Sequence, residues 1–256
     1  MRGIPQRMVC LSAESADWLW RIGAWGNVVG ITSFFTPPSD APAKPRVSGF
    51  STAKLEEIVA LNPDLVITFS DVQAQLAQEL IKRGLSVLAT NQRTVAEIEA
   101  TLALLGRVVG REAEAEERLR EFRERLAPVK MAGVRPRIYF EEWNDPLITG
   151  IGWVGELIER AGGDDIFAER RGRAASERVV SLEEVCCANP EIIVASWCGK
   201  AVRAGAISSR SGWAEVTAVR HGRIYEIPSD DILQPGFRLV YGYERLKEII
   251  KAELKK

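Results

Sequence analysis

The fold is decided by the stretch at residues 55–69, which reads Leu-Glu-Glu-Ile-Val-Ala-Leu-Asn-Pro-Asp-Leu-Val-Ile-Thr-Phe. The pattern of this stretch returns 127 residues later. The second copy, at 182–197, reads Leu-Glu-Glu-Val-Cys-Cys-Ala-Asn-Pro-Glu-Ile-Ile-Val-Ala-Ser-Trp. Each copy places an Asn-Pro pair seven residues after its leucine, then an acidic residue and an apolar run that ends near an aromatic residue. A match of this length, displaced by about half the chain, indicates an internal repeat. The sequence therefore predicts two related lobes.

Segments with strand and helix character alternate around both copies. In the first half the pattern predicts strands at 7–11, 28–31, 64–69 and 85–88 and helices at 17–26, 52–61 and 72–83, with Ser51 or Thr52 as the cap of the second helix. In the second half it predicts a strand at 137–140, a helix followed by glycines at 153–163 and a terminal helix at 241–256. This alternation indicates parallel βα units whose helices cover a buried sheet.

The run from 111 to 125 is dominated by charge and has only a narrow apolar stripe. It is either a solvated helix lying on one domain or a long helix that bridges two domains. We expect an α/β fold of two related lobes with mostly parallel central sheets, joined by one long helix, with a ligand cleft between the lobes. The expected boundaries are 1–106 for the first lobe, 107–130 for the helix and 131–256 for the second lobe.

Composition excludes several classes of protein and of site. The chain has 34 Lys and Arg against 35 Asp and Glu, so no overall basic field would hold nucleic acid. No apolar run reaches the roughly 18–20 residues of a membrane-spanning helix, so we expect a soluble globular protein. A single histidine, His221, rules out sites built from several histidines within one chain, and we expect no metal site and no cofactor.

Two further features bear on the compartment. The four cysteines, Cys10, Cys186, Cys187 and Cys198, contain no C-x-x-C pair, and we expect buried free thiols. The first fifteen residues have no apolar stretch and no small-residue cleavage site, so they do not read as a signal peptide. The expectation is therefore either a cytoplasmic protein or a trimmed chain.

The predicted strand ends point to a binding site. Ligands of open α/β sheets lie beyond the carboxyl ends of the strands. Phe69 and Trp197 fall at equivalent strand ends in the two copies. Each is either a core aromatic or a side chain facing a ligand, and their equivalence favours the ligand.

At this point the sequence resembles the substrate-binding proteins of ABC importers, in the group that binds cobalamin and ferric siderophores. The resemblance rests on the stretch from Leu55 to Ile67 and on Ala-Gly-Gly-Asp-Asp-Ile-Phe at 161–167, and it covers nearly the whole chain. It implies two lobes joined by one long helix, a periplasmic or cell-surface location, and no enzymatic activity. We expect a monomer that meets the membrane only through its permease partner.

The resemblance also implies site residues. Glu56 and Glu183, at equivalent helix starts, match the acids that dock on permease arginines; a solvated helix face is the alternative. The residues implied as ligand contacts are Phe50, Phe69, Glu142, Trp143, Trp197, Asp231 and Arg238. They include a loop at 141–146 and a second loop at 229–238, although Arg238 could equally form a structural salt bridge. Flat aromatic side chains and a few polar groups suit a corrinoid, which has a wide apolar face edged with amides.

Other functions remain open from the sequence. A ferric siderophore or haem is the alternative ligand, although an anionic siderophore complex would require more arginines than Arg238 alone. An enzyme would have to use paired carboxylates such as Glu141 or Glu142 with Asp145 or Asp231, and no nucleophile-and-base motif supports one. A cytoplasmic corrinoid-binding module is the third possibility. His221 precedes a predicted strand and is expected to be a surface turn residue rather than a metal or haem ligand.

Overall fold

The computed structural model of the chain describes residues 3–130, 133–172 and 174–255. Met131 and Ala132, which open the predicted second lobe, and Lys256, which ends the predicted terminal helix, lie outside these ranges. The described chain divides into two compact units: residues 1–92 with 96–122, and residues 93–95 with 123–256. The predicted boundaries, and the predicted role of the charged helix as the only link, remain predictions.

The first unit is a five-stranded parallel sheet with the strand order β3-β2-β1-β4-β5. Its strands are β1 (Met8–Cys10), β2 (Val28–Thr32), β3 (Arg46–Ser48), β4 (Leu65–Phe69) and β5 (Val87–Thr90), and its helices are α1 (Ala13–Arg21), α2 (Leu55–Ala60), α3 (Ala74–Lys82), α4 (Val95–Val108) and α5 (Glu112–Arg125). One face of the sheet packs on α2 and α3 through a cluster that includes Val9, Ile58 and Leu80. Trp18 of α1 donates its indole N–H to the carbonyl of Leu102 in α4 (2.8 Å).

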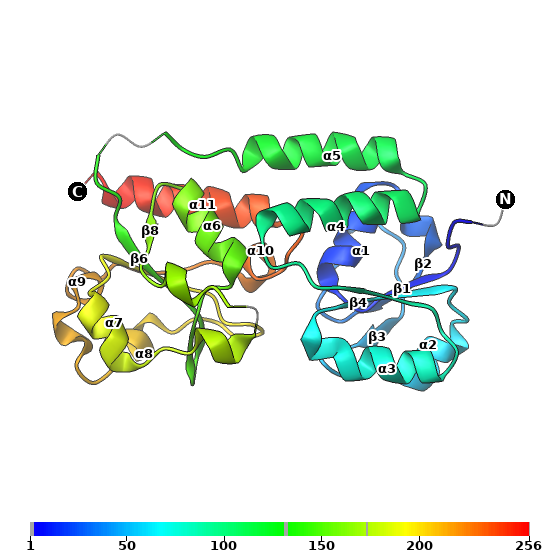
Figure 1. Cartoon of the computed structure of the whole chain (residues 1–256), viewed down its shortest axis with the longest axis horizontal. Helices are drawn as coiled ribbons and strands as arrows, with labels where there is room; N and C mark the ends of the chain where they lie inside the picture. The colour runs from blue at the N-terminus through cyan, green and yellow to red at the C-terminus, as the bar shows by residue number, and fades with distance from the viewer. Residues whose placement is uncertain (1–2, 131–132, 173, 256) are drawn as a thin grey trace. The chain divides into compact units, whose positions relative to one another are not determined.

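Helices α4 and α5 are antiparallel and lie side by side (Figure 1). Gly110, with a φ of 65°, makes the turn between them. A Cβ on Gly106 would lie 2.4 Å from the Cβ of Ala115, so the absence of a side chain there allows the two helices to approach. The charged run thus forms one helix, α5, preceded by a separate and more apolar helix.

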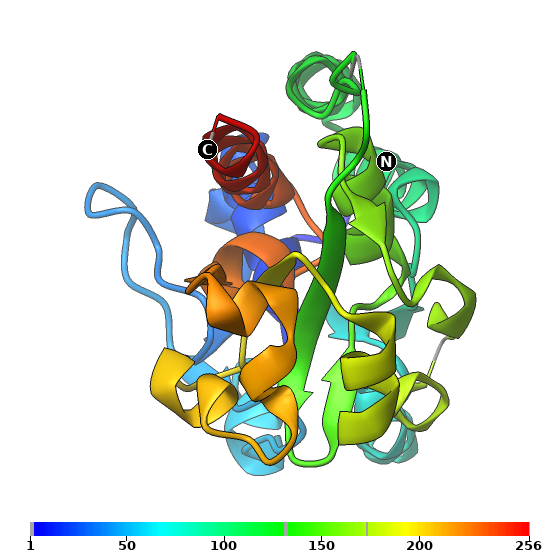
Figure 2. The same ribbon diagram turned by 90° about the vertical axis from the view of Figure 1, so that its left-hand side faces the viewer.

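The second unit contains a five-stranded sheet with the path β10-β9-β6-β7 and with β8 paired to β6. Its strands are β6 (Arg137–Asn144), β7 (Leu147–Thr149), β8 (Asp164–Asp165), β9 (Ile192–Ala195) and β10 (Ile224–Glu226), and its helices are α6 (Gly152–Arg160), α7 (Leu182–Ala188), α8 (Ala204–Ser208), α9 (Thr217–Arg220), α10 (Ser229–Ile232) and α11 (Leu239–Glu253). The pairings are parallel except for the β6–β7 hairpin. The long strand β6 runs through the middle of the unit (Figure 2).

The structure confirms the internal repeat, because the two copies share helix ends and hydrogen bonds. Asn62 and Asn189 both end their helices with a positive φ, of 47° and 43°. Asp64 then accepts hydrogen bonds from the backbone N–H groups of Gln6 (2.7 Å) and Arg7 (3.0 Å). Glu191 accepts the equivalent bond from the N–H of Arg137 (2.9 Å). The repeated acids thus fasten β4 and β9 to the start of the strand beside each, and the predicted α/β class with two mostly parallel sheets is confirmed.

Four sequence predictions about local structure are wrong at their boundaries. Helix α1 begins at Ala13, four residues before the predicted start, because only Leu11 and Ser12, which has an extended backbone, separate it from β1. Helix α2 begins at Leu55 and neither Ser51 nor Thr52 caps it, because residues 52–54 are bonded back to Val47 and Gly49. The predicted loop at 141–146 is largely strand, since Glu141 to Asn144 pair with β7. The predicted loop at 229–238 begins with the short helix α10.

The expectation of buried thiols holds for one cysteine only. All four are free in the structure; Cys10 is buried, Cys186 and Cys198 are half-buried, and Cys187 is exposed. Burial raises the pKa of Cys10 to about 12, which keeps it a thiol. Cys186 and Cys187 lie on α7, where adjacent residues point in different directions.

Replacement of the two repeated asparagines tests the positive-φ helix ends. We expect Asn62→Ala to lower the free energy of unfolding by about 1 kcal/mol, because alanine tolerates this backbone poorly. Asn189→Ala should cost about 2 kcal/mol, since Asn189 also accepts the N–H of Thr217 (2.8 Å). Denaturant unfolding measures both. Asn62→Gly is the control that should stay near wild type, and equal losses for Asn62→Gly and Asn62→Ala would contradict the backbone explanation.

Candidate functional site

The carboxyl edge of the first sheet carries exposed aromatic side chains. Phe50 follows β3 and is 51% exposed, and Phe34, which follows β2, is 39% exposed. Their rings meet edge to face with centroids 6.1 Å apart. Phe69 ends β4 and is half-buried. Exposed phenyl groups that gather at one sheet edge offer apolar area to a ligand.

Gln73 fixes the position of this edge. Its side chain is buried and donates hydrogen bonds to the carbonyls of Leu11 (2.9 Å) and Phe50 (2.8 Å). Its side-chain oxygen accepts the N–H of Phe69 (3.0 Å). One amide group therefore joins the segments that leave β1, β3 and β4, and it holds the backbone of both predicted aromatic contacts of this unit.

Ser70, the next residue after Phe69, has a strained backbone with φ 62° and ψ 173°. Residues other than glycine rarely adopt this region, and it costs on the order of 1–3 kcal/mol. Hydrogen bonds from its N–H to the carbonyl of Thr90 (2.7 Å) and from the N–H of Val72 to its hydroxyl (3.3 Å) hold it there. Strain of this kind at a strand end favours the edge as a functional site.

A buried carboxyl group lies at the same edge. Glu14, in the first turn of α1, is 6% exposed, and its Oε1 has no hydrogen-bond partner among the described residues. Burial, and to a smaller extent the charge of Asp17, raise the pKa of Glu14 to about 7 against the opposing effect of a hydrogen bond with Ser12. Glu14 therefore changes its protonation near neutral pH.

The carboxyl edge of the second sheet holds two tryptophans in different environments. Trp197 is only 4% exposed and belongs to the hydrophobic core of its unit. It donates its indole N–H to Glu141 (3.1 Å), whose fully buried carboxylate forms a bidentate ion pair with Arg210 (2.5 and 2.9 Å). Trp143 is half-buried and donates to the carbonyl of Asp145 (2.9 Å). Trp197 thus fits the core alternative, and Trp143 has the more accessible ring.

The predicted polar contacts are engaged within the chain. The carboxylate of Glu142 is held by the buried guanidinium of Arg178 (2.5 and 3.0 Å). Asp231 pairs with Arg238 (2.5 Å). Burial raises the pKa of Asp231, and the guanidinium of Arg238 opposes that shift. The salt-bridge alternative for Arg238 is therefore present in the structure, at the start of α11.

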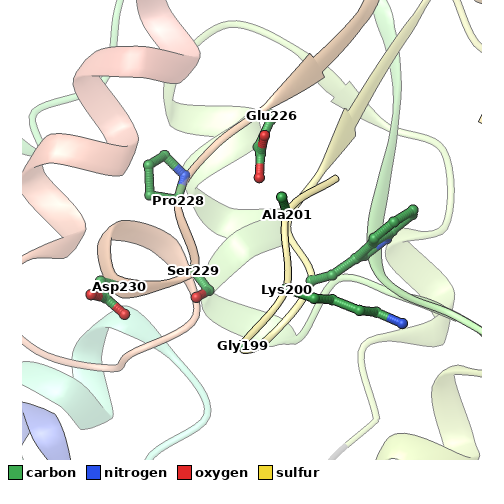
Figure 3. Close-up of a pocket in the computed structure, with 8 residues that line it drawn as sticks. Gly199, Lys200, Ala201, Glu226, Pro228, Ser229 and Asp230 are labelled. Atoms are coloured by element: carbon green, nitrogen blue, oxygen red, sulfur yellow. The ribbon is translucent and has the colours of Figure 1, made fainter. Parts of the chain in front are cut away.

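A pocket of about 290 Å³ opens where β9 and β10 end. It is lined by Trp197, Gly199, Lys200, Ala201, Glu226, Pro228, Ser229 and Asp230. Figure 3 shows the segments 199–201 and 228–230 on its two sides. Its lining side chains carry carboxylate, hydroxyl and ammonium groups, so it can accept hydrogen bonds from amide groups as well as donate them.

The two predicted docking acids are both exposed at the second position of a short helix, Glu56 in α2 and Glu183 in α7. Glu56 lies 3.0 Å from the guanidinium of Arg83. No ion pair of Glu183 occurs among the described residues. The repeat thus places the two acids equivalently, with different neighbours.

Other kinds of site find no support in the described part of the chain. No group of three or more His, Cys, Asp or Glu side chains there could hold a metal ion. No helix that the structure describes has the length and apolar character needed to cross a membrane. His221 is exposed at the end of α9, at the amino end of β10, and its Nδ1 lies 2.9 Å from the carbonyl of Thr217.

The structure thus groups the predicted ligand residues into separate sets. Gln73 links Phe50 and Phe69, the ammonium of Lys200 lies over both Trp143 and Trp197, and Asp231 pairs with Arg238. Sequence reasoning missed Phe34, Gln73 and Lys200. Phe34 and Lys200 each follow a predicted strand within a few residues, which is the signal that could have identified them.

Comparisons with known proteins agree with this architecture. A family model described as "Periplasmic binding protein" matches residues 8–231. The chain is 28% identical over 254 residues to a protein named "Cobalamin-binding protein" of Halobacterium salinarum, covering 94% of this chain and 68% of that protein. It is 25% identical over 261 residues to an uncharacterized ABC transporter substrate-binding lipoprotein of Bacillus subtilis. This match covers 96% of this chain and 80% of that protein.

Solved structures share the fold. The periplasmic vitamin B12-binding protein of Vibrio cholerae matches with a TM-score of 0.75 and 22% identity, covering 98% of this chain and 99% of that one. Haem-binding proteins also have this fold, so the fold alone does not determine the ligand.

Gln73 provides a test of the first edge. We expect Gln73→Ala to lower the free energy of unfolding by about 2–4 kcal/mol, because it leaves two carbonyls and one N–H at the strand ends without partners. Chemical denaturation checks the loss. Gln75→Ala, an exposed position on the next helix, is the matched control and should change little. A loss at Gln73 no larger than at Gln75 would contradict the linking role.

Glu14 gives a prediction about pH. Its pKa is raised from 4.5 to about 7, so its neutral form stabilises the fold below pH 4.5, and this stabilisation is lost as the pH rises through 7. The difference amounts to about 3 kcal/mol. Glu14→Gln should therefore gain thermal stability over wild type at pH 8 but not at pH 5. The exposed Glu57→Gln is the control, and a pH-independent offset for Glu14→Gln would rule out the titration.

Proposed function

Because this chain belongs to the periplasmic binding protein family, we propose that it captures a corrinoid, a ligand of the cobalamin class, and delivers it to the permease of an ABC importer. It is an ABC substrate-binding protein and not an enzyme. The corrinoid is the proposal, and the observation that carries it is the exposed Phe34–Phe50 pair at the carboxyl edge of the first sheet.

The aromatic groups suit a wide and flat apolar ligand. Phe34 and Phe50 are exposed aromatic residues of the first unit, and Phe69 ends β4, where Gln73 joins it to the segment that carries Phe50. Trp143 adds an accessible indole at the corresponding edge of the second unit. Such rings bury much area for little loss of side-chain freedom, which favours binding of a corrin face.

The polar groups support a ligand edged with amides. Glu226, Ser229 and Asp230 line the pocket of the second unit and can accept hydrogen bonds from amide N–H groups. Arg178, Arg210 and Arg238 are already paired with carboxylates of the chain. A strongly anionic ferric siderophore or a haem with two carboxylates would therefore meet more negative than free positive charge in this pocket. His221 lies at the opposite strand end from the pocket and would not reach a haem iron.

The names of relatives point the same way. Besides the cobalamin-binding protein of Halobacterium salinarum, a vitamin B12-binding protein of Vibrio parahaemolyticus is 25% identical over 90% of this chain. We propose that the corrinoid contacts Phe50, Phe69 and Trp143 directly, that Asp231 and Arg238 bind its edge, and that Glu142 and Trp197 act through the positions they give their neighbours.

We propose Glu56 and Glu183 as the residues that dock on the permease. Their equivalent places in the repeat support this, since two matched lobes would present one acid each. We also propose that the chain is a monomer, works on the outer side of the cytoplasmic membrane, and has its lobes joined by α5. An apolar leader encoded upstream in the gene would agree with this location, whereas the cytoplasmic-module alternative requires Met1 to be the native start.

Titration with cyanocobalamin tests the ligand. We expect stoichiometric binding by calorimetry and retention of the visible absorbance after desalting. Phe50→Ala and Trp143→Ala should each weaken the affinity about tenfold, as expected when an aromatic contact is truncated. Trp20→Ala, a half-buried tryptophan near the end of α1, is the control that should bind as wild type.

The same titration with haem and with a ferric siderophore separates the alternatives. Binding of either one, with no binding of cyanocobalamin, would overturn the corrinoid assignment while the family remains. Trp197→Ala is a poor probe, since removal of a core indole would destabilise the unit by about 3–5 kcal/mol.

A further inference from the structure

Lys200 is a cation placed on the aromatic cluster of the second unit. It follows β9 by five residues and lines the pocket described above. Its Nζ lies 3.9 Å from the ring centroid of Trp143 and 5.3 Å from that of Trp197. It also donates a hydrogen bond to Oδ1 of Asn144 (2.7 Å), which fixes the ammonium over the half-buried ring.

The charge of Lys200 is not neutralised within the described chain. Arg178, Arg210 and Arg238, which lie in the same unit, each pair with a carboxylate at 2.5 Å. Lys200 has only a neutral amide and two indole rings as its partners among the residues that the structure describes. A cation that is oriented but not ion-paired remains available for an anion on a ligand.

The acids around the pocket limit where such an anion could bind. Glu226 and Asp230 line the pocket, and Figure 3 shows the ammonium of Lys200 directed away from both of them. Glu226 accepts the N–H of Val202 (3.0 Å), and Asp230 accepts the side chain of Gln234 (3.1 Å). An anion would therefore bind on the Trp143 side of Lys200, while the pocket itself takes neutral, hydrogen-bonding groups.

We propose that Lys200 binds the phosphodiester of a complete corrinoid and makes the protein prefer ligands that carry the nucleotide loop. This inference rests on the proposed function. A corrin ring edged with amides is uncharged at its rim, whereas the loop that carries the lower base contains one anionic phosphodiester. One unpaired cation beside carboxylate acceptors matches that combination of many amides and one anion.

Two ligands that differ in the loop test the proposal. Cyanocobalamin contains the phosphodiester, and dicyanocobinamide lacks the lower base together with it. We expect Lys200→Gln to weaken cyanocobalamin binding about fivefold and to leave dicyanocobinamide binding unchanged. Lys200→Arg should restore most of the affinity for cyanocobalamin. Added salt should weaken cyanocobalamin binding to wild type more than to Lys200→Gln.

Lys247→Gln is the matched control, because Lys247 also lies over an aromatic ring, that of Tyr243 (4.7 Å), but on α11. It should bind both corrinoids as wild type does. Equal losses for both corrinoids in Lys200→Gln, or no loss for either, would overturn the proposal while the corrinoid function stands. Absence of binding of both corrinoids to wild type would instead overturn the proposed function itself.

Discussion

In each sheet, a carboxylate accepts hydrogen bonds from the backbone at the start of the neighbouring strand, and this interaction sets the register of the two strands. In the first unit this is Asp64, which accepts the N–H groups of Gln6 and Arg7 while its own N–H donates to the carbonyl of Arg7. Glu191 does the same at Arg137. Because a shift of one residue would turn every side chain to the other face, this lock determines which residues leave the far ends of β1, β4, β6 and β9.

The far ends are then fixed by buried polar side chains, and the two units use different chemistry. Gln73 joins three strand ends as a neutral amide and needs no counter-ion. Glu141 holds Trp197 as a fully buried carboxylate, which requires the bidentate guanidinium of Arg210. Removal of either member of this ion pair would leave the other charge without a counter-ion, which would lower the stability of the fold. The second edge therefore has a stricter sequence requirement than the first, although the repeat makes the two look alike.

The sequence was a good guide wherever structure follows from short-range pattern. The Asn-Pro-acid repeat predicted β4, β9 and the helices before them, and the apolar runs predicted most strands. The sequence was a poor guide where hydrogen bonds between distant residues determine the bounds of a helix or strand. The bond of Lys54 to Val47 delays the start of α2, and pairing with β7 turns residues 141–144 into strand. Among the candidate site residues, side-chain partners such as Arg178 for Glu142 lie 36 residues apart and leave no local signal.

Charge pairing within the chain supports the proposed class of ligand. A count of basic residues near the predicted site would treat Arg178, Arg210, Arg238 and Lys200 alike. The structure separates them, because each arginine already satisfies a carboxylate and adds no net charge to its surroundings. The exposed carboxylates of Glu226 and Asp230 then outweigh the single ammonium of Lys200 in the pocket lining. A ligand with several anionic groups would be repelled by this excess of negative charge. A flat apolar ligand with amides at its edge and one negative charge would match the lining.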